Sequence, residues 1–150
     1  QVDTFTAHYR QHPVRHTRIF DGVVPVLEYL AARGVKLGVC TNKPHESAVM
    51  VLEALSLDRH FGACIGKAAL PFNKPDRRHY DEVAKRLGIA PEDSIYVGDS
   101  ETDVATARNA GVPVVLVTFG YSIVPVSELG ADRLVEKFSE LPAALEELFP

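Results

Sequence analysis

The stretch SIYVGDSETD, residues 94–103, decides the fold that this 150-residue sequence predicts. Residues 95–97 form a short apolar run that is typical of a buried strand. A glycine and several polar residues follow directly, and a segment rich in alanine then runs to Gly111, which predicts a helix that ends at a glycine. A strand that leads through a polar loop into a helix is the repeating unit of parallel α/β sheets.

The same unit recurs on both sides of this stretch. Residues 35–40 predict a buried strand that stops at the polar residues 41–44, residues 63–65 predict a weaker strand, and residues 114–117 predict another. Apolar residues at helical spacing predict four more helices, carried by Val23, Val26, Leu27 and Leu30; by Ala48, Val51, Leu52 and Leu55; by Tyr80, Val83, Ala84 and Leu87; and by Leu141, Ala144, Leu145 and Leu148. We therefore expect an α/β fold of three layers, a Rossmann-like parallel sheet with helices on both faces.

Composition narrows the classes of function. The chain is 46% hydrophobic and carries 16 Lys and Arg against 20 Asp and Glu, so it suits one soluble domain and gives no electrostatic reason to expect nucleic acid or an anionic membrane as a partner. No run approaches the roughly 20 apolar residues of a membrane-spanning helix. The cytoplasm is the expected location. Cys40 and Cys64 form no CxxC motif, so we interpret both as buried thiols.

Polar side chains follow the predicted strands at the points where the strands end. Ligands of parallel sheets bind beyond the carboxyl ends of the strands, so Thr41 and Asn42, Lys74, and the stretch from Asp99 to Asp103 are expected to converge on one site. A hydroxyl group with backbone N–H groups at a helix start can hold an anion, and a lysine can neutralise a phosphate. Two carboxylates four residues apart can bind a divalent cation such as Mg²⁺.

Each feature also has an ordinary structural explanation. Asp99 or Ser100 can cap the helix that follows, and acidic residues are favourable in the first turn of a helix. A Thr-Asn pair after a strand is common turn chemistry, and a loop lysine is usually solvated. Together, however, a hydroxyl donor, a lysine and a carboxylate pair on strand-exit loops are the parts that phosphoryl transfer needs.

In this order, Thr41, Lys74 and the Gly98-Asp99-Ser100-x-x-Asp103 run resemble the second, third and fourth motifs of the haloacid dehalogenase superfamily. Three stretches are more specific, TNKP at 41–44, FNKPD at 72–76, and FGY at 119–121 followed by VPVSELGAD at 124–132. These resemble bacterial phosphoglycolate phosphatases over essentially the whole chain. One departure is Arg77, which stands where relatives often carry a proline.

The resemblance implies a role for each residue. Thr41 and nearby backbone amides would hold the phosphoryl oxygens, with Asn42 as a weaker phosphate-binding candidate, and Lys74 would offset charge between phosphate and nucleophile. Asp99 would bind Mg²⁺ directly. Asp103 would support the metal through water or by orienting Lys74.

The superfamily's first motif, Asp-x-Asp-Gly-Thr, does not occur in the sequence; Asp21-Gly22 lacks the preceding aspartate. The resemblance implies that the nucleophile lies upstream, on a central strand whose absence would expose two strand edges. Residues 1–19 are expected to be the remnant of a helical cap, its last helix, and residues 20–150 a core without its first strand. The 150-residue chain alone is expected to be inactive.

The expected function is hydrolysis of a small phosphomonoester, 2-phosphoglycolate above others, through an aspartyl-phosphate intermediate. The alternatives are another small-molecule phosphatase, a sugar phosphomutase, or, from a different class, a non-catalytic module that binds phosphate or serves assembly. The expected partner is a small phosphorylated metabolite; the sequence does not predict an oligomeric state.

Overall fold

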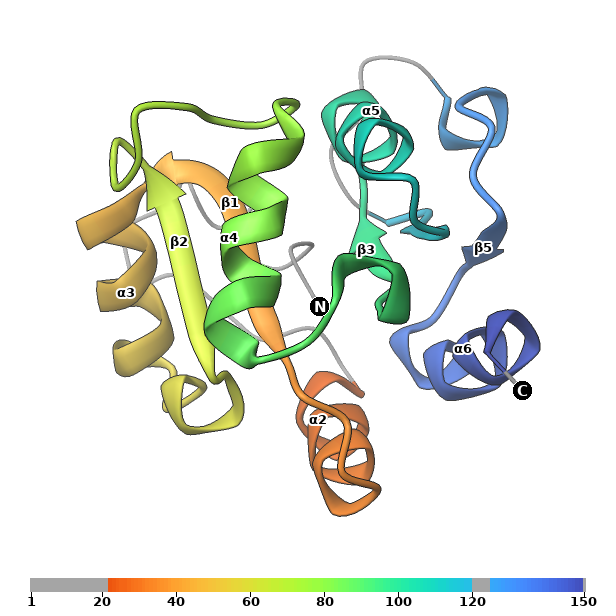
Figure 1. Cartoon of the computed structure of the whole chain (residues 1–150). Helices are drawn as coiled ribbons and strands as arrows, with labels where there is room; N and C mark the ends of the chain where they lie inside the picture. The colour runs from red at the N-terminus through yellow and green to blue at the C-terminus, as the bar shows by residue number, and fades with distance from the viewer. Residues whose placement is uncertain (1–21, 120–124, 150) are drawn as a thin grey trace.

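The computed structural model describes residues 22–119 and 125–149. Helices and strands alternate from α2 to β4, as the sequence predicts, and within these described ranges β5 then follows β4 without an intervening α-helix (Figure 1). The elements are α2 (Val23–Ala32), β1 (Gly38–Pro44), α3 (His45–Ala54), β2 (Ala63–Lys67), α4 (Arg77–Leu87), β3 (Tyr96–Gly98), α5 (Glu101–Ala110), β4 (Val114–Val117), β5 (Arg133–Val135) and α6 (Leu141–Leu148). Short 3₁₀ turns connect several of them.

All strand pairs are parallel, and the strands form two hydrogen-bonded groups. One group is β1–β2, and the other has the order β3–β4–β5. Within the described residues, β1 and β3 make no ladder with each other, so each keeps one edge outside the ladders. The prediction of a parallel α/β architecture is confirmed, with the sheet in two parts.

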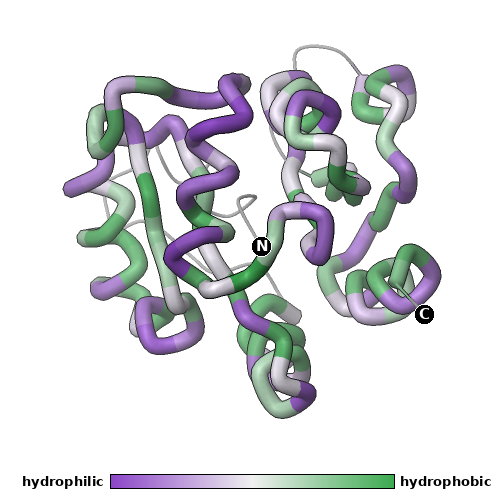
Figure 2. The backbone as a smooth tube through the Cα atoms, in the orientation of Figure 1, coloured by the Kyte–Doolittle hydropathy of each residue, from purple (hydrophilic) through white to green (hydrophobic). Residues whose placement is uncertain are grey.

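Two apolar clusters cover the two faces of the strands. Consecutive strand residues alternate between them: Val97 contributes to the cluster with α2, α3 and α6, whereas Tyr96 contributes to the cluster with α4 and α5. Figure 1 shows α4 and α5 on the near side of the strands, and Figure 2 shows hydrophobic and hydrophilic residues alternating along the helices. The helices thus form the two outer layers of a three-layer arrangement.

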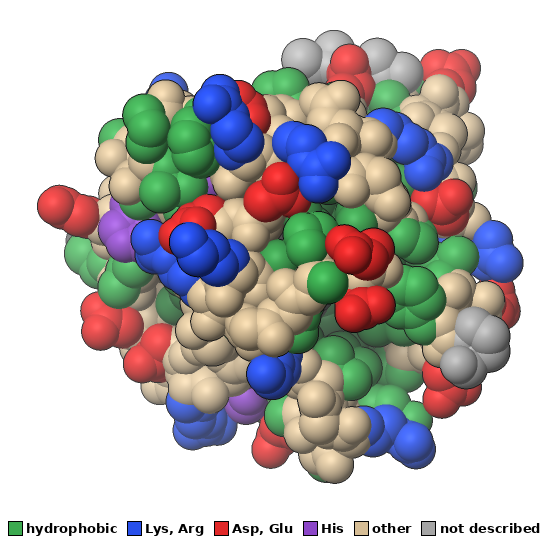
Figure 3. Space-filling model, in the orientation of Figure 1, with side chains coloured by type: hydrophobic (Ala, Val, Ile, Leu, Met, Phe, Trp, Pro, Cys, Tyr) green, Lys and Arg blue, Asp and Glu red, His purple; other side chains and the backbone are tan. Residues whose placement is uncertain are grey.

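A pocket of about 400 Å³ lies beside the amino-terminal ends of β1 and β3. Its apolar lining includes Leu37, Ile95 and Val97, together with Leu141 and Leu145 on α6. Figure 3, in the orientation of Figure 1, shows hydrophobic side chains gathered in a hollow near the middle of the molecular surface that faces the viewer. The pocket therefore borders the beginning of β1 and of β3, each of which has an edge outside the described ladders.

The strands differ from the prediction in four places. β2, predicted at residues 63–65, extends to Lys67. β1 starts at Gly38 and continues to Pro44, because its pairing with β2 extends through the polar residues to Pro44↔Lys67 after a register irregularity. β3 spans Tyr96–Gly98, so it begins and ends one residue later than the apolar run at 95–97. β5 was not predicted, since Arg133 and Leu134 are exposed and only Val135 is buried, which leaves little apolar signal.

Several expectations concern residues outside the described ranges. The proposed cap remnant, residues 1–19, and Asp21 lie there, as does part of the stretch that follows Phe119. Of the two cysteines, Cys40 is buried and Cys64 is only partly buried. Among the helices of residues 22–119 and 125–149, none is long and apolar enough to cross a membrane.

Gly66 allows the end of β2 to approach the junction of β1 and α3. A Cβ atom at this position would lie 2.4 Å from His45 Cα and 2.6 Å from the Lys43 carbonyl oxygen. The His45 ring also accepts a hydrogen bond from the Gly66 N–H at 3.1 Å. Backbone atoms cannot move aside as a flexible side chain can, so this close contact requires glycine.

We expect Gly66→Ala to lower the free energy of unfolding by about 2 kcal/mol or more, because the added methyl group collides with backbone. Gly62→Ala is the matched control, since its Cβ would meet the end of the Leu87 side chain at 2.9 Å. Urea unfolding of both variants tests this. If both variants lowered the free energy of unfolding by the same small amount, the requirement for glycine at position 66 would be contradicted.

Candidate active site

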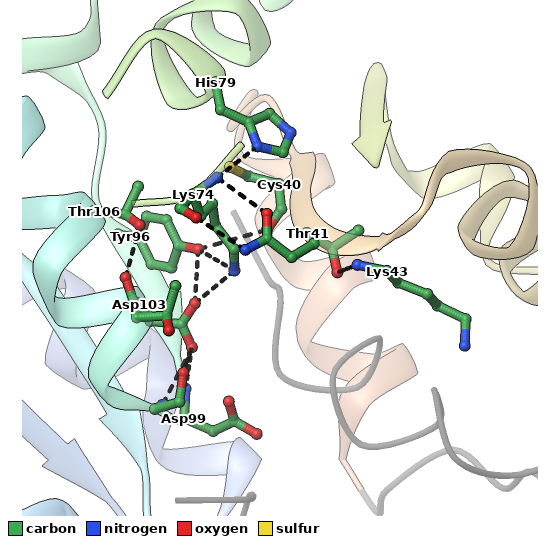
Figure 4. A network of polar contacts seen from close by, with 12 residues as sticks. Cys40, Thr41, Lys43, Lys74, His79, Tyr96, Asp99, Asp103 and Thr106 are labelled. Atoms are coloured by element: carbon green, nitrogen blue, oxygen red, sulfur yellow. Dashed lines mark hydrogen bonds and ion pairs between the residues drawn. The ribbon is translucent and has the colours of Figure 1, made fainter. Parts of the chain in front are cut away.

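The predicted site residues lie at the carboxyl ends of β1 and β3 and in the loop after β2 (Figure 4). Hydrogen bonds link Asn42 to Lys74, Lys74 to Asp103, and Asp103 to the backbone of Asp99. Thr41 precedes Asn42 on β1; it is buried, and its hydroxyl accepts a hydrogen bond from the Lys43 N–H at 3.1 Å. The structure thus brings these residues together at one edge of the sheet.

The Lys74 ammonium connects the two groups of strands. It donates hydrogen bonds to Asp103 Oδ1 at 2.8 Å and to the Tyr96 hydroxyl at 2.9 Å. The Tyr96 hydroxyl in turn donates to Asp103 Oδ1 at 2.8 Å. The side chains of Lys74 and Asp103 are 5% and 1% exposed, so this is a buried ion pair. Such a pair is tolerated only when further hydrogen bonds satisfy both charges.

The backbone of Lys74 is held as firmly as its side chain. The Asn42 amide donates to the Lys74 carbonyl at 3.0 Å and accepts from the Lys74 N–H at 3.0 Å. His79 Nδ1 accepts from the same N–H at 3.2 Å. One residue further on, the Asn109 amide donates to the Pro75 carbonyl at 2.8 Å. Side chains from β1, α4 and α5 therefore position this short segment.

Asp103 also organises the loop between β3 and α5. Its Oδ2 accepts from the Asp99 N–H at 2.8 Å, from the Ser100 N–H at 3.2 Å and from the Ser100 hydroxyl at 3.1 Å. The side chain folds over Gly98, where an added Cβ would lie 2.4 Å from its carboxylate. The Ser100–Asp103 pair forms a capping box at the start of α5. Ser100 therefore caps this helix, as one of the ordinary structural explanations of the sequence motif predicted.

Burial alone would raise the pKa of the Asp103 carboxyl. The Lys74 ammonium and the hydrogen bonds from Lys74, Asp99 N–H and Tyr96 outweigh burial and hold this pKa well below its ordinary value. Asp103 is therefore ionised across the physiological range. Its negative charge offsets part of the desolvation cost of burying the Lys74 ammonium.

Asp99 differs from Asp103 in orientation. Its side chain is buried in the fold, 1% exposed, and Figure 4 shows its carboxylate directed away from Asp103. Both Asp103 oxygens carry several hydrogen bonds, so the two carboxylates do not face one point. Oxygen donors suit Mg²⁺, which uses one or two carboxylates and otherwise binds water and substrate. The donor set fits Mg²⁺ at Asp99, and residues 22–119 and 125–149 contain no cluster of three His, Cys, Asp or Glu side chains that could hold a metal.

Arg77, the departure from the family pattern, is the first residue of α4. Its guanidinium pairs with Asp81 one turn further along the helix, at 2.8 Å, in an exposed position. The pair offsets the charge that Arg77 would otherwise add. Arg77 therefore supports the helix start.

The sequence analysis did not identify Tyr96, His79 and Asn109 as parts of the site. Tyr96 was assigned to the buried strand alone, and its ring does pack against Tyr80. The available signal was a residue with a hydroxyl group two positions before Gly98, where the strand meets the Gly98-Asp99 loop. His79 and Asn109 gave no local signal, since their partners lie 5 and 34 residues away in sequence.

Comparisons with known proteins identify relatives of the whole chain. Residues 1–117 match the family model described as haloacid dehalogenase-like hydrolase. Phosphoglycolate phosphatases of Rhodospirillum rubrum and Agrobacterium fabrum are 42% and 41% identical, over 91% and 97% of this chain. The chain spans 57% and 62% of the length of these two relatives.

Solved structures share the fold. A predicted phosphoglycolate phosphatase from Haemophilus somnus superposes with a TM-score of 0.81 at 31% identity, covering 85% of this chain and 57% of the other. A putative β-phosphoglucomutase from Thermotoga maritima superposes with a TM-score of 0.74 at 29% identity, covering 86% and 60%. These two structures therefore share the fold of most of this chain.

We expect Asp103→Asn to lower the free energy of unfolding by about 3 kcal/mol or more, because it leaves the buried Lys74 ammonium without its counter-charge. Asp81→Asn, which breaks the exposed pair with Arg77, is the control and is expected to change stability by less than about 1 kcal/mol. Urea denaturation measures both. Similar values for the two variants would contradict the importance of the buried pair.

Proposed function

The chain belongs to the haloacid dehalogenase-like hydrolase family, and we propose that it forms the phosphate-binding part of an enzyme that hydrolyses a small phosphomonoester. The observation that carries the proposal is the buried Lys74 ammonium, fixed by Asp103 and Tyr96 at the carboxyl ends of the strands. A buried charged lysine is expensive to maintain. A phosphate that binds beside it would use that charge.

Each site residue has a proposed role. The Thr41 hydroxyl and nearby backbone N–H groups would hold the phosphoryl oxygens, and Lys74 would neutralise charge between phosphate and nucleophile. Asn42 remains a candidate for phosphate contact, although both atoms of its amide group already bond to the Lys74 backbone. Asp103 would act through Lys74, since its oxygens are occupied by protein donors.

Asp99 would hold Mg²⁺. When bound, this ion would neutralise the negative charge of the transferring phosphoryl group. The protein would contribute a buried carboxylate whose loop is fixed by the Asp103 side chain. Further ligands would come from water, from the substrate, and from residues outside the described ranges.

The proposed mechanism is covalent. An aspartate upstream of residue 1 would attack phosphorus, the leaving alkoxide would take a proton from a general acid, and water would then hydrolyse the aspartyl-phosphate to release inorganic phosphate. The edges of β1 and β3 that remain outside the described ladders support a place for this strand between them. The apolar pocket at their amino-terminal ends would receive its apolar side chains.

The preferred substrate is 2-phosphoglycolate, because relatives at about 40% identity are named phosphoglycolate phosphatases. A sugar phosphomutase is the second candidate, favoured by the similarity to a putative β-phosphoglucomutase. A non-catalytic phosphate-binding module would share the lysine and the anion cradle without turnover. A cytoplasmic location remains a prediction.

In the protein that carries this chain together with its upstream segment, we expect Lys74→Met and Asp99→Asn each to reduce kcat by about a hundredfold or more, because each removes charge stabilisation from the transferring phosphoryl group. Lys85→Met, an exposed substitution on α4, is the control and should leave kcat unchanged. The assay measures phosphate release from 2-phosphoglycolate, glucose 1-phosphate and glucose 6-phosphate. Equal activity of wild type and both site variants would refute the assignment.

Removal of Mg²⁺ with excess chelator is expected to abolish this hydrolysis, and added Mg²⁺ to restore it. Asp99→Asn should raise the Mg²⁺ concentration required for half-maximal activity, because a charged ligand is lost. Undiminished hydrolysis in chelator would contradict the metal assignment. Phosphate binding without turnover in the wild-type full-length protein would favour the non-catalytic module.

A further inference from the structure

His79 is a fully buried polar side chain beside the site, and the proposed function gives it no role in the chemistry. It lies on the first turns of α4 with 0% of its surface exposed. Both ring nitrogens have partners in the backbone: Nδ1 faces the Lys74 N–H at 3.2 Å, and Nε2 faces the Ile65 carbonyl oxygen at 3.1 Å. The ring thus spans the two ends of the loop that joins β2 to Lys74.

The partners determine the protonation state of the ring. The Lys74 N–H is a donor, so Nδ1 must be an unprotonated acceptor; the Ile65 carbonyl is an acceptor, so Nε2 must carry the hydrogen. Only the neutral Nε2–H tautomer satisfies both contacts. A second proton on Nδ1 would point at the Lys74 N–H and break that hydrogen bond.

The electrostatic surroundings agree with a neutral ring. Burial lowers the pKa of His79; the hydrogen bond to the Ile65 carbonyl opposes this, the Lys74 ammonium adds to it, and the Asp76 carboxylate opposes it, with a lowered pKa as the result. Because both nitrogens are occupied by backbone partners, the ring has no nitrogen with which to exchange protons with a substrate.

We infer that His79 is a positioning residue that fixes the Lys74 backbone so that the Lys74 ammonium stays at the phosphate site. The Lys74 N–H has two acceptors, Asn42 Oδ1 on β1 and His79 Nδ1 on α4, while the ammonium is held by Asp103 and Tyr96. The lysine is therefore fixed at both ends, from elements on both sides of the site (Figure 4). The contacts that position Lys74 are independent of the proposed function. The inference rests on the proposed function in one respect, that the ligand beside the Lys74 ammonium is a phosphate.

The geometry also explains why a histidine performs this task. The loop from residue 68 to residue 73 begins with Ala68 in the left-handed region, at φ 69°, and closes on itself through the Ala68 N–H, which donates to Asn73 Oδ1 at 3.3 Å. Its two ends need one acceptor and one donor at a fixed separation. A neutral imidazole supplies both on one rigid ring.

Two substitutions distinguish the contribution of the Nδ1 hydrogen bond from that of the Nε2 hydrogen bond. The side-chain oxygen of asparagine can take the place of Nδ1, so His79→Asn keeps the acceptor for Lys74 and loses the contact to Ile65. The longer glutamine can place its amide N–H near Nε2, so His79→Gln keeps the Ile65 contact and loses the one to Lys74. Each variant loses one buried hydrogen bond, so comparable decreases in the urea midpoint are expected.

The test uses the full-length protein with both variants. We expect His79→Gln to lower kcat by about tenfold or more, since small displacements of a charged group at a reacting centre are costly, and His79→Asn to stay within about threefold of wild type. Amide hydrogen exchange at Lys74, measured by NMR, should accelerate in His79→Gln and remain close to wild type in His79→Asn. Equal effects of the two variants on kcat and on Lys74 exchange would overturn the inference and leave a purely structural role.

Two further readouts keep the test decisive. The exchange measurement does not need turnover, so an inactive wild-type enzyme would refute the proposed function while Lys74 exchange still decides the role of His79. Where neither variant folds, the ¹⁵N shifts of the His79 ring in the wild-type protein decide it. Protonated Nε2 with unprotonated Nδ1 is expected near neutral pH, and a protonated Nδ1 would overturn the inference.

Discussion

The buried ion pair between Lys74 and Asp103 is the constraint on which the arrangement of the site depends. Two charges that are almost completely removed from water need several hydrogen bonds each, or burial would favour their neutral forms. Asp103 obtains them from Tyr96 and from the Asp99–Ser100 loop, and its position over the chain requires glycine at 98. The loop that presents Asp99 is therefore shaped by the counter-ion of the lysine.

The same pair links the two halves of the sheet. Lys74 follows β2, whereas Asp103 and Tyr96 belong to the β3–α5 unit, and no described ladder joins β1 to β3. Below the pair, apolar side chains from both halves share the two clusters that pack against the helices. The polar connection thus sits at the carboxyl ends of the strands, where parallel sheets bind their ligands. Lys74 therefore both links the two groups of strands and supplies the charge that the proposed chemistry needs.

Much of this arrangement could be predicted from local pattern. Strand, loop and helix succession predicted the α/β fold, and the rule for strand ends predicted that Lys74, Asp99 and Asp103 would lie together. The continuation of β1 through Thr41 to Pro44 could not be predicted, because pairing with β2 overrides the polar composition. β5 was missed because it is short and largely exposed. The contacts of His79 depend on the folded loop, so no spacing in the sequence indicated them.

The most direct test of the central claim is a crystal structure of the full-length protein grown with Mg²⁺ and inorganic phosphate. We expect phosphate at the carboxyl ends of β1 and β3, within hydrogen-bond distance of the Lys74 ammonium and the Thr41 hydroxyl, with Mg²⁺ bound to the Asp99 carboxylate. Lys74 should keep its contact with Asp103 in that complex. Phosphate bound elsewhere, with Lys74 contacting only protein groups, would contradict the claim that this buried ion pair serves phosphoryl transfer.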